Sequence, residues 1–468
     1  MVVSVGAAHA QANPGSARLA GPGFLMGGTG VALGNQSTVA LINPARMTRV
    51  EAGSFFISRF IFSRINTSSD FFAPRAAWDA ENVGTSVMDI DLLLGGVCFT
   101  DDFGTAAAAP RDEWGTTGHA GRHHVGVCVV VDQKEDILAT ARQPESTPLR
   151  VSGSLVQRWV RRQIGAGWGW DVTDEISVGA STLVSIANYR EATFGSSVEP
   201  IAAPVLRTAQ LDAVGTSFDV SAHLGLSYRF GRHVTLGLAA RLPSIHVAGS
   251  WARTSFSAES GGGFSRASEF GSFRAPIPAR VSFGAGFHTE DVRGEVDLSA
   301  HLPLAGLLEV NNERVSSDAI GAPDSSPPHG RRERGRARVL LGGGLEWRVL
   351  RQVGLMTGFS VDPSLFDSLT TAAPDRLAFR RVDRIHASGG LSLYGPAGRL
   401  IVGSRLTYGF GELRVADSLS SPPGPAVADH EEFAALVHIG GRIELEQLTG
   451  LRGGLRGLFS LGDDDEAN

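Results

Sequence analysis

The sequence predicts an all-β protein, specifically a transmembrane antiparallel β-barrel of about fourteen strands. Three observations predict this fold. Apolar and polar residues alternate over long segments, the connections between these segments switch between short and long, and aromatic residues gather at one end of the segments.

The alternation is clearest in Val292–Leu302, where apolar or small residues occupy every second position. A period of two places the two sets of side chains on opposite faces of a strand. One apolar face and one charged face are typical of a barrel with lipid outside and a polar lumen. About fourteen segments follow this pattern: 54–65, 86–99, 123–133, 156–170, 175–190, 216–230, 233–248, 278–288, 292–303, 336–349, 352–361, 384–394, 398–411 and 432–445.

The connections support the same interpretation. Short ones fall at 171–175, 231–233, 289–291, 350–352 and 395–397. Long polar stretches fall at 135–147, 193–213, 254–276, 309–335, 362–382 and 414–429. Short periplasmic turns and longer extracellular loops alternate in this way in outer-membrane barrels, and an even strand number places both ends in the periplasm. The connection 100–122 fits poorly, because it is long and falls on the periplasmic side.

Aromatic residues lie just before the short turns: Trp168, Trp170, Tyr228, Phe230, Phe287, Trp347 and Tyr394. Bilayer interfaces favour such rings, which have an apolar body and, in Tyr and Trp, a polar tip. Enrichment at strand ends in any sheet is the alternative, but both ends should then be enriched.

Charged residues on the polar face are expected to face the lumen: Arg241, Glu295, Asp297, Glu346, Arg399, Arg405, Arg442 and Glu444. A β-sandwich would show similar alternation. It would not combine inward charges on long strands with the regular change of connection length. We interpret these residues as a solvated or ion-paired network without a catalytic role.

Composition narrows the class further. No predominantly apolar run is long enough for a membrane helix. Glycine is abundant, with 59 residues, and in a barrel it permits bending and leaves space in the lumen. The net charge is −6 and no basic stripe occurs, so nucleic acid is not an expected partner.

Both termini lie outside the predicted barrel, which spans residues 52–446. Residues 1–12 end in Ala-rich sequence that suits a signal-peptidase site, so we interpret them as a signal-peptide remnant; a disordered small-residue start is the alternative. Residues 447–468 are interpreted as a periplasmic tail. Its acidic run at 463–466 is expected to be a solvated charge cluster rather than a metal site.

The two cysteines are expected to be free thiols. Strict alternation places Cys98 on the apolar face with Leu92 and Leu94, and it places Cys128 on the polar face with His124. Opposite faces disfavour a disulfide, although exported proteins often contain one.

Residues 13–51 have a different character, with many glycines and no alternating strand of full length. No Lys follows the glycines, and their spacing does not match a dinucleotide fingerprint. Six residues stand out as a motif: Gly27, Gly28, Gly30, Asn43, Pro44 and Ala45. An ordered N-terminal tail is one interpretation of this segment.

This segment resembles the start of the FadL-type outer-membrane transporter superfamily, the channels for long-chain fatty acids and other hydrophobic compounds. The resemblance rests on Gly27–Leu33, on the polar stretch Asn35–Thr38, and on the Asn-Pro-Ala motif at 43–45. It implies fourteen strands and an N-terminal hatch, formed here by residues 13–51, that plugs the lumen; an unplugged barrel of this width would leak. Asn35 and Gln36 replace the usual acidic pair, and Arg46 stands where Gly is frequent. PorV-like barrels, which serve protein secretion, share the same segment.

Three functions remain open from the sequence. A channel for passive uptake of hydrophobic compounds would have a hatch and an adjoining apolar pocket, whereas a PorV-like scaffold would lack the pocket. A lumen hydrolase would need a Ser/His/acid cluster, but no nucleophile-elbow or zinc-protease motif occurs. We expect a monomeric, non-enzymatic channel in the outer membrane, with membrane lipid and a hydrophobic small molecule as partners and no cofactor or metal.

Overall fold

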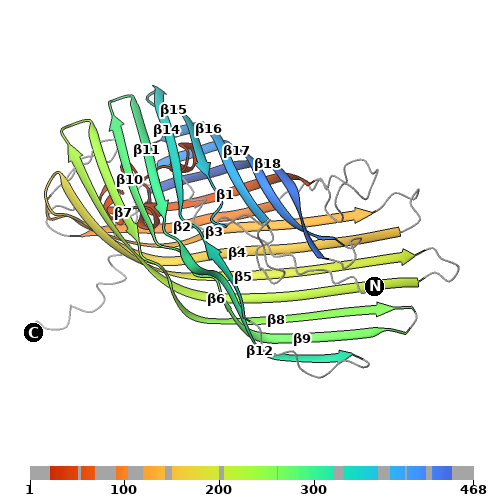
Figure 1. Ribbon diagram of the computed structural model, residues 1–468. Coiled ribbons are helices and arrows are strands. Elements are labelled where there is room, and N and C mark those ends of the chain that lie inside the picture. Colours follow the sequence, from red (N-terminus) through yellow and green to blue (C-terminus); the bar gives the residue numbers. More distant parts are fainter. Residues whose placement is uncertain are drawn as a thin grey trace, which may run out of the picture.

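The computed structural model describes residues 22–50, 54–68, 91–103, 120–142, 150–199, 205–260, 262–319, 330–366, 380–395, 398–417 and 424–444. In this part of the chain, β-strands form one antiparallel sheet of 18 strands (Figure 1). The first half contributes β1 (Ser54–Ser68), β2 (Asp91–Phe103), β3 (His123–Arg142), β4 (Arg150–Asp171), β5 (Ile176–Glu199), β6 (Val205–Phe230), β7 (Val234–Arg241), β8 (Ile245–Glu259) and β9 (Phe264–Arg274). The second half contributes β10 (Arg280–His288), β11 (Val292–His301), β12 (Leu304–Ala319), β13 (Gly330–Gly335), β14 (Arg338–Leu350), β15 (Val353–Asp362), β16 (Arg380–Gly395), β17 (Gly398–Asp417) and β18 (Gly424–Glu444).

The series of strand pairings begins and ends at β1, which pairs with both β2 and β18. Neighbouring strands pair from β1 to β7, and β7 then pairs with β10. The series continues through β11, β14, β15, β16, β17 and β18. Finally, β18 pairs with β1 along the whole of β1. The strands in this series correspond to the fourteen segments that the alternation predicts.

Four further strands were not predicted as separate elements: β8, β9, β12 and β13. They pair with β6 and with one another beyond the ends of β7, β10, β11 and β14. The predicted strand 233–248 is therefore wrong as one unit, because Leu242–Ser244 separates β7 from β8. Pro243, Pro276, Pro278 and Pro303 lie in the breaks, where proline removes a ladder donor.

The predicted long loops are shorter than expected. Much of 135–147, 193–213, 254–276 and 309–335 is strand, and β6 alone has 26 residues. A bilayer needs only about 9–11 residues per strand, so these strands extend well beyond that length. The parts of these strands that are farthest from the short turns are rich in Ser, Thr and Arg. They are paired within the sheet, whereas the sequence pattern predicts irregular loops there.

The two faces of the sheet differ as the alternation predicts. We call the face that contacts residues 22–50 the inner face and the opposite one the outer face. On β3, Val125, Val127 and Val129 are exposed on the outer face, whereas His124 and Cys128 are buried on the inner face. The outer face thus carries an extensive set of exposed apolar side chains.

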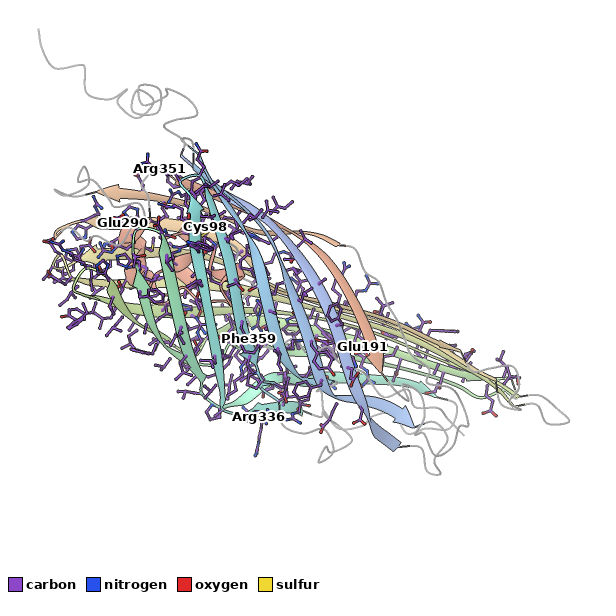
Figure 2. The ribbon with its side chains drawn as sticks, turned by 90° about the horizontal axis from the view of Figure 1, so that it is seen from above. Cys98, Glu191, Glu290, Arg336, Arg351 and Phe359 are labelled. Carbon is purple, nitrogen blue, oxygen red and sulfur yellow. A yellow bond between two sulfur atoms is a disulfide. The ribbon has the colours of Figure 1, made fainter. Side chains whose placement is uncertain are left out.

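The short turns share one end of the sheet. Glu290 and Arg351, which belong to two of them, lie at one end in Figure 2, and Glu191 and Arg336 lie toward the other. Trp168, Tyr228, Phe287 and Trp347 are exposed on the outer face near the short turns. Tyr394 has the predicted position along its strand but is directed inward, where its hydroxyl donates to Glu346.

The prediction of two free thiols is wrong, because Cys98 and Cys128 form a disulfide. They stand directly opposite each other on β2 and β3, and both are buried. The cause is a β-bulge in β2. Ser58 pairs with Gly96 but Arg59 pairs with Leu94, so one extra residue enters the strand. A bulge reverses the alternation, so the face of Cys98 does not follow from counting along the strand from residues before the bulge.

None of the helices that the structure describes is long and apolar enough to span a membrane. The predicted signal-peptide remnant at 1–12, most of the connection 100–122 and the predicted tail at 447–468 lie outside the described residues.

Candidate functional site

The N-terminal segment, residues 22–50, lies against the inner face. It contains the single-turn helix α1 (Pro22–Leu25) and the 3₁₀-helices η1 (Ser37–Leu41) and η2 (Pro44–Arg49). Nearly all of its side chains are buried, including Phe24, Leu25 and Met47. They form an apolar cluster with inner-face residues such as Leu183 and Met356. A segment too short and glycine-rich to fold alone thus acquires its structure from contacts with the strands of the sheet, which we call the wall.

Glycines of the wall provide the space that this segment occupies. A Cβ atom on any of them would overlap or press on an atom of residues 25–47. These glycines are Gly126, Gly167, Gly169, Gly179, Gly225, Gly237, Gly284, Gly286, Gly342, Gly344, Gly358, Gly390 and Gly403. They come from ten strands between β3 and β17. The expectation that glycine leaves space in the lumen is therefore supported, and the N-terminal segment fills that space.

The predicted motif glycines shape the turn after α1. Gly27 and Gly28 have φ angles of 74° and 82°, a region that strongly favours glycine. Gly27 also lies so close to β14 that a Cβ on Gly342 would be 2.5 Å from its carbonyl oxygen. Gly30 has a φ of 150° and begins the stretch that meets β11.

The Asn-Pro-Ala motif joins two parts of the segment to the wall. Asn43 is the N-cap of η2, and its Oδ1 accepts from the backbone N of Ala45 at 3.2 Å. Its Nδ2 donates to the carbonyl oxygen of Val31 at 2.7 Å and to that of Leu226 on β6 at 3.1 Å. Pro44 occupies the first helical position, where its missing N–H costs nothing.

Two of the predicted lumen carboxylates bind the backbone of this segment. Asp297 Oδ2 accepts from the N–H groups of Gly30 at 2.9 Å and Val31 at 3.1 Å. Glu295 Oε1 accepts from residues 32 and 33 at 2.5 and 3.2 Å. Both carboxylates are buried on β11. Consecutive N–H groups directed to one side form a concavity that binds acceptor oxygens, and here the wall itself supplies these oxygens.

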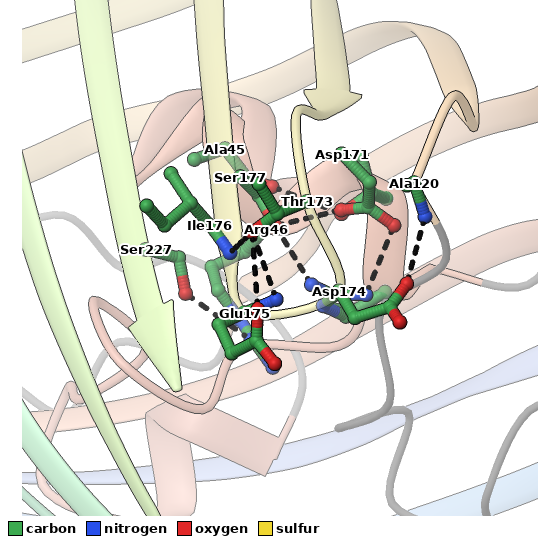
Figure 3. A network of polar contacts seen from close by, with 12 residues as sticks. Ala45, Arg46, Ala120, Asp171, Thr173, Asp174, Glu175, Ile176, Ser177 and Ser227 are labelled. Atoms are coloured by element: carbon green, nitrogen blue, oxygen red, sulfur yellow. Dashed lines mark hydrogen bonds and ion pairs between the residues drawn. The ribbon is translucent and has the colours of Figure 1, made fainter. Parts of the chain in front are cut away.

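Arginines anchor the other end of the segment beside a short turn (Figure 3). Arg49 pairs with Asp171 at 3.1 Å and donates to Ser177 Oγ at 2.7 Å, and all three are buried. Figure 3 shows Asp171 and Ser177 next to each other at this turn. Arg46 donates to the carbonyl oxygen of Gly34 at 3.1 Å and to Ser227 Oγ at 3.4 Å. Arg46 departs from the family pattern, and the structure gives it a role in linking the segment to β6.

Glu346 is the centre of a second buried network on the inner face. It pairs with Arg293 at 2.7 Å and with Arg399, and it accepts from the Tyr394 hydroxyl at 2.6 Å. Arg293 also donates to Asn35 Oδ1 at 3.4 Å. Glu346 and Arg399 are among the predicted lumen residues, whereas Arg293 and Tyr394 are not, although Arg293 alternates with the apolar residues of Val292–Leu302.

The other predicted lumen residues are dispersed around these networks. Arg241 is buried and donates to the carbonyl oxygen of Pro278 at 3.2 Å. Arg405 lies over the ring of Phe24, with 5.3 Å to the centroid, and contacts Ser360. Arg442 is partly buried on β18. Glu444 ends β18, and its side chain lies outside the described residues.

A cavity of about 90 Å³ lies between the N-terminal segment and the wall. Its lining combines Phe24 and Leu341 with the polar side chains of Arg280, Asp297 and Arg405. Pockets for drug-sized ligands usually hold about 300–1,000 Å³. The cavity is therefore a narrow gap beside the segment and, as it stands, no ligand site of that size.

A second apolar cluster fills the inner face nearer the other end of the strands. The rings of Trp159, Tyr189, Trp251 and Phe273 are packed together, with centroids of contacting pairs 5.8 to 6.3 Å apart. Leu307, Leu308, Val310, Leu365 and Phe366 complete it. We call this group the aromatic cluster. Sequence reasoning missed it because most of its residues lie in predicted loops or on the expected polar face.

One cluster tests the hydrolase hypothesis. Ser217 Oγ and Asp219 Oδ1 each lie 3.3 Å from Nδ1 of His246, and Ser217 donates to Asp219 at 2.8 Å. A catalytic triad uses one ring nitrogen for the serine and the other for the acid. Here both contact Nδ1, and Ser217 also accepts from the backbone N of Ala275 at 3.1 Å. This arrangement fixes the β9–β10 connection and does not activate a nucleophile.

The described residues contain no group of three or more His, Cys, Asp or Glu side chains that could hold a metal ion.

Comparison with solved structures identifies the fold. The CymD monoaromatic hydrocarbon channel matches with a TM-score of 0.56 and 14% identity, covering 91% of this chain and 98% of that one. The Pseudomonas putida toluene transporter TodX matches with a TM-score of 0.56 and 12% identity, covering 89% and 97%. A Pseudomonas aeruginosa FadL homologue matches with a TM-score of 0.54 and 13% identity, covering 94% and 100%.

No family model and no curated protein sequence matches the chain. The class that the structure defines is therefore a barrel-type antiparallel β-sheet. More particularly, the chain shares the fold of the FadL-type channels, as the motif at 27–45 predicted.

Proposed function

We propose that this protein is an outer-membrane channel for passive uptake of hydrophobic compounds such as long-chain fatty acids or aromatic hydrocarbons. The N-terminal segment acts as its hatch. The observation that carries the proposal is the fit of this segment to the glycines of ten strands. A sequence that reserves so many positions for one peptide uses that peptide to close the space inside the ring of strands.

The solved structures of the same fold support this class of solute. Their titles describe a monoaromatic hydrocarbon channel and a toluene transporter. The exposed apolar outer face suits a bilayer, in which such a sheet has no free polar backbone. The aromatic cluster offers an apolar environment on the inner face, nearer the strand ends opposite to the short turns.

Uptake by cells provides the test. The full chain is produced in a Gram-negative host that lacks its own fatty-acid channel, and uptake of radiolabelled oleate and toluene is measured. We expect the full chain to raise the initial rate of at least one of them above that of the empty vector at equal surface expression. Equal rates for both solutes would refute the uptake proposal.

The hatch is tested separately by deleting residues 21–50. We expect this variant to give a larger ion conductance in planar bilayers than the full chain, because the deletion empties the space between the strands. Uptake of labelled fatty acid into liposomes that the deletion leaves unchanged would count against gating by the hatch. Resistance of the barrel to unfolding by SDS at room temperature verifies that the variant is folded.

One observation favours a second candidate, a PorV-like scaffold without small-molecule transport. The cavity beside the hatch is small and partly polar, and the aromatic cluster is packed instead of open. A scaffold predicts no uptake by the full chain or by any opened variant. It also predicts that deletion of the gene removes particular proteins from the culture medium, which proteomics of that medium would detect.

A further inference from the structure

The middle of the N-terminal segment is held by two buried carboxylates. All four consecutive N–H groups of residues 30–33 donate to β11, two to Asp297 and two to Glu295. Each of the two side chains accepts two neighbouring N–H groups through one oxygen, so four successive backbone donors of the segment depend on one strand of the wall.

The same stretch is held from its other side. Asn43 Nδ2 donates to the carbonyl oxygen of Val31 at 2.7 Å, while Asp297 accepts from the N–H of Val31 at 3.1 Å. Both backbone polar groups of Val31, its N–H and its carbonyl oxygen, thus have side-chain partners from separate parts of the chain. Asn43 also reaches Leu226 on β6. The Asn-Pro-Ala motif and the side chains of Glu295 and Asp297 therefore both hold the backbone of the segment around Val31.

Several wall positions around this point are glycines, which have no side chain to support the segment. Gly237 and Gly284 face Val31 and Ala32, and Gly286 faces Leu33. A Cβ on Gly284 would lie 2.8 Å from Cβ of Val31. The gap of about 90 Å³ borders Asp297 and Val31, so the backbone has space to move away on that side once the carboxylates release it.

We propose that Glu295 and Asp297 form the latch that decides whether the hatch stays in place. The inference rests on the proposed role of the segment as a hatch and names the wall residues that control it. The latch acts by hydrogen bonds from main-chain N–H groups to side-chain oxygens, so it requires acceptors at 295 and 297 and tolerates different side chains at 31–33. Loss of both acceptors frees residues 30–33, whereas Arg49 and Asp171 still anchor the end of the segment.

The test compares the double variant E295A/D297A, which removes the acceptor oxygens, with D219A. Asp219 is a fully buried inner-face carboxylate whose hydrogen bonds go to the wall residues Ser217 and His246, which makes it a matched control. Hydrogen–deuterium exchange of the amides of residues 30–33 is measured in detergent micelles. We expect exchange in the double variant to be at least about tenfold faster, as local opening becomes easier, with D219A unchanged from the parent.

Unchanged exchange at 30–33 in the double variant would overturn the latch. So would equal acceleration in D219A, because the effect would then be general loosening. The single variants keep the proposal testable if the double variant does not fold, since each should accelerate only its own pair of amides. The exchange readout does not depend on transport: failure to take up oleate or toluene would refute the proposed function and leave the latch intact.

Discussion

Asn43 reaches back twelve residues to bind the carbonyl oxygen of Val31 at 2.7 Å, and through this contact the motif at 43–45 fixes the stretch that β11 also binds. The same amide caps η2 through Oδ1. A sequence motif that reads as a local turn therefore makes one local and two distant contacts.

Replacing Asn43 with Ala removes all three hydrogen bonds. We expect the free energy of unfolding to fall by about 1–3 kcal/mol, because the buried carbonyl of Val31 loses its amide donor. Urea unfolding of the micelle-bound protein, followed by tryptophan fluorescence, measures the loss. Asn312→Ala is the control: Asn312 donates to Glu269 far from the segment, and it should leave amide exchange at 30–33 unchanged. An Asn43→Ala protein with parental exchange there would contradict the role of the motif.

Gly344 and Gly343 offer a matched pair on opposite faces of β14. A Cβ on Gly344 would lie 2.5 Å from Cβ of Met26, whereas one on Gly343 would meet only Glu295 O and Val296 Cγ2 at 3.7 Å. We expect Gly344→Ala to cost about 1–3 kcal/mol of stability through overpacking. Gly343→Ala should stay within about 1 kcal/mol of the parent.

The cause of that cost can be isolated by repeating both substitutions in a chain without residues 21–50. The penalty at position 344 should then disappear, since Met26 is gone. A penalty that persists would place its origin in the strand and contradict a fit between the glycines and the segment.

The sequence predicts the strands of the sheet well and the contacts of the N-terminal segment less well. The alternation located the fourteen strands of the pairing ring because the two-residue period records directly which side chains face inward. It failed at β8, β9, β12 and β13, since polar strand extensions resemble loops when their partners are unknown. It placed Glu295 and Asp297 correctly on the inner face. It could not show that their partners are backbone N–H groups, which leave no trace in side-chain patterns.

Departures from a family pattern were equally ambiguous in the sequence. Asn35 replaces an expected acidic residue, yet its Oδ1 still accepts from Arg293. Arg46 replaces a small residue and supplies two donors to the segment and to β6. Whether such a change removes or replaces a contact depends on residues far away in the chain.

Cys98 and Cys128 illustrate how one bulge defeats a pattern, and their disulfide gives a direct prediction. Non-reducing mass spectrometry should find the two cysteines in one cross-linked peptide pair, and denatured protein should show no free thiol. Replacing both with Ser should lower stability by about 2–4 kcal/mol, through the loss of a link between strands that are 30 residues apart in sequence. A thiol-alkylating reagent that modifies both residues without prior reduction would contradict the pairing.

Glu346 is fully buried between Arg293 and Arg399, and Glu309 pairs with the exposed Arg332 at 3.7 Å. Removing one partner of a buried network leaves its other charges uncompensated, which costs about 3–5 kcal/mol. Exposed pairs contribute only about 0–1 kcal/mol. We therefore expect Glu346→Gln to destabilise the protein severely and Glu309→Gln to have little effect in urea unfolding. Because Arg293 also contacts Asn35, Glu346→Gln should in addition accelerate amide exchange in the N-terminal segment around residue 35. Equal stability losses for the two variants would show that the Glu346 network is solvated in the same way as the surface pair.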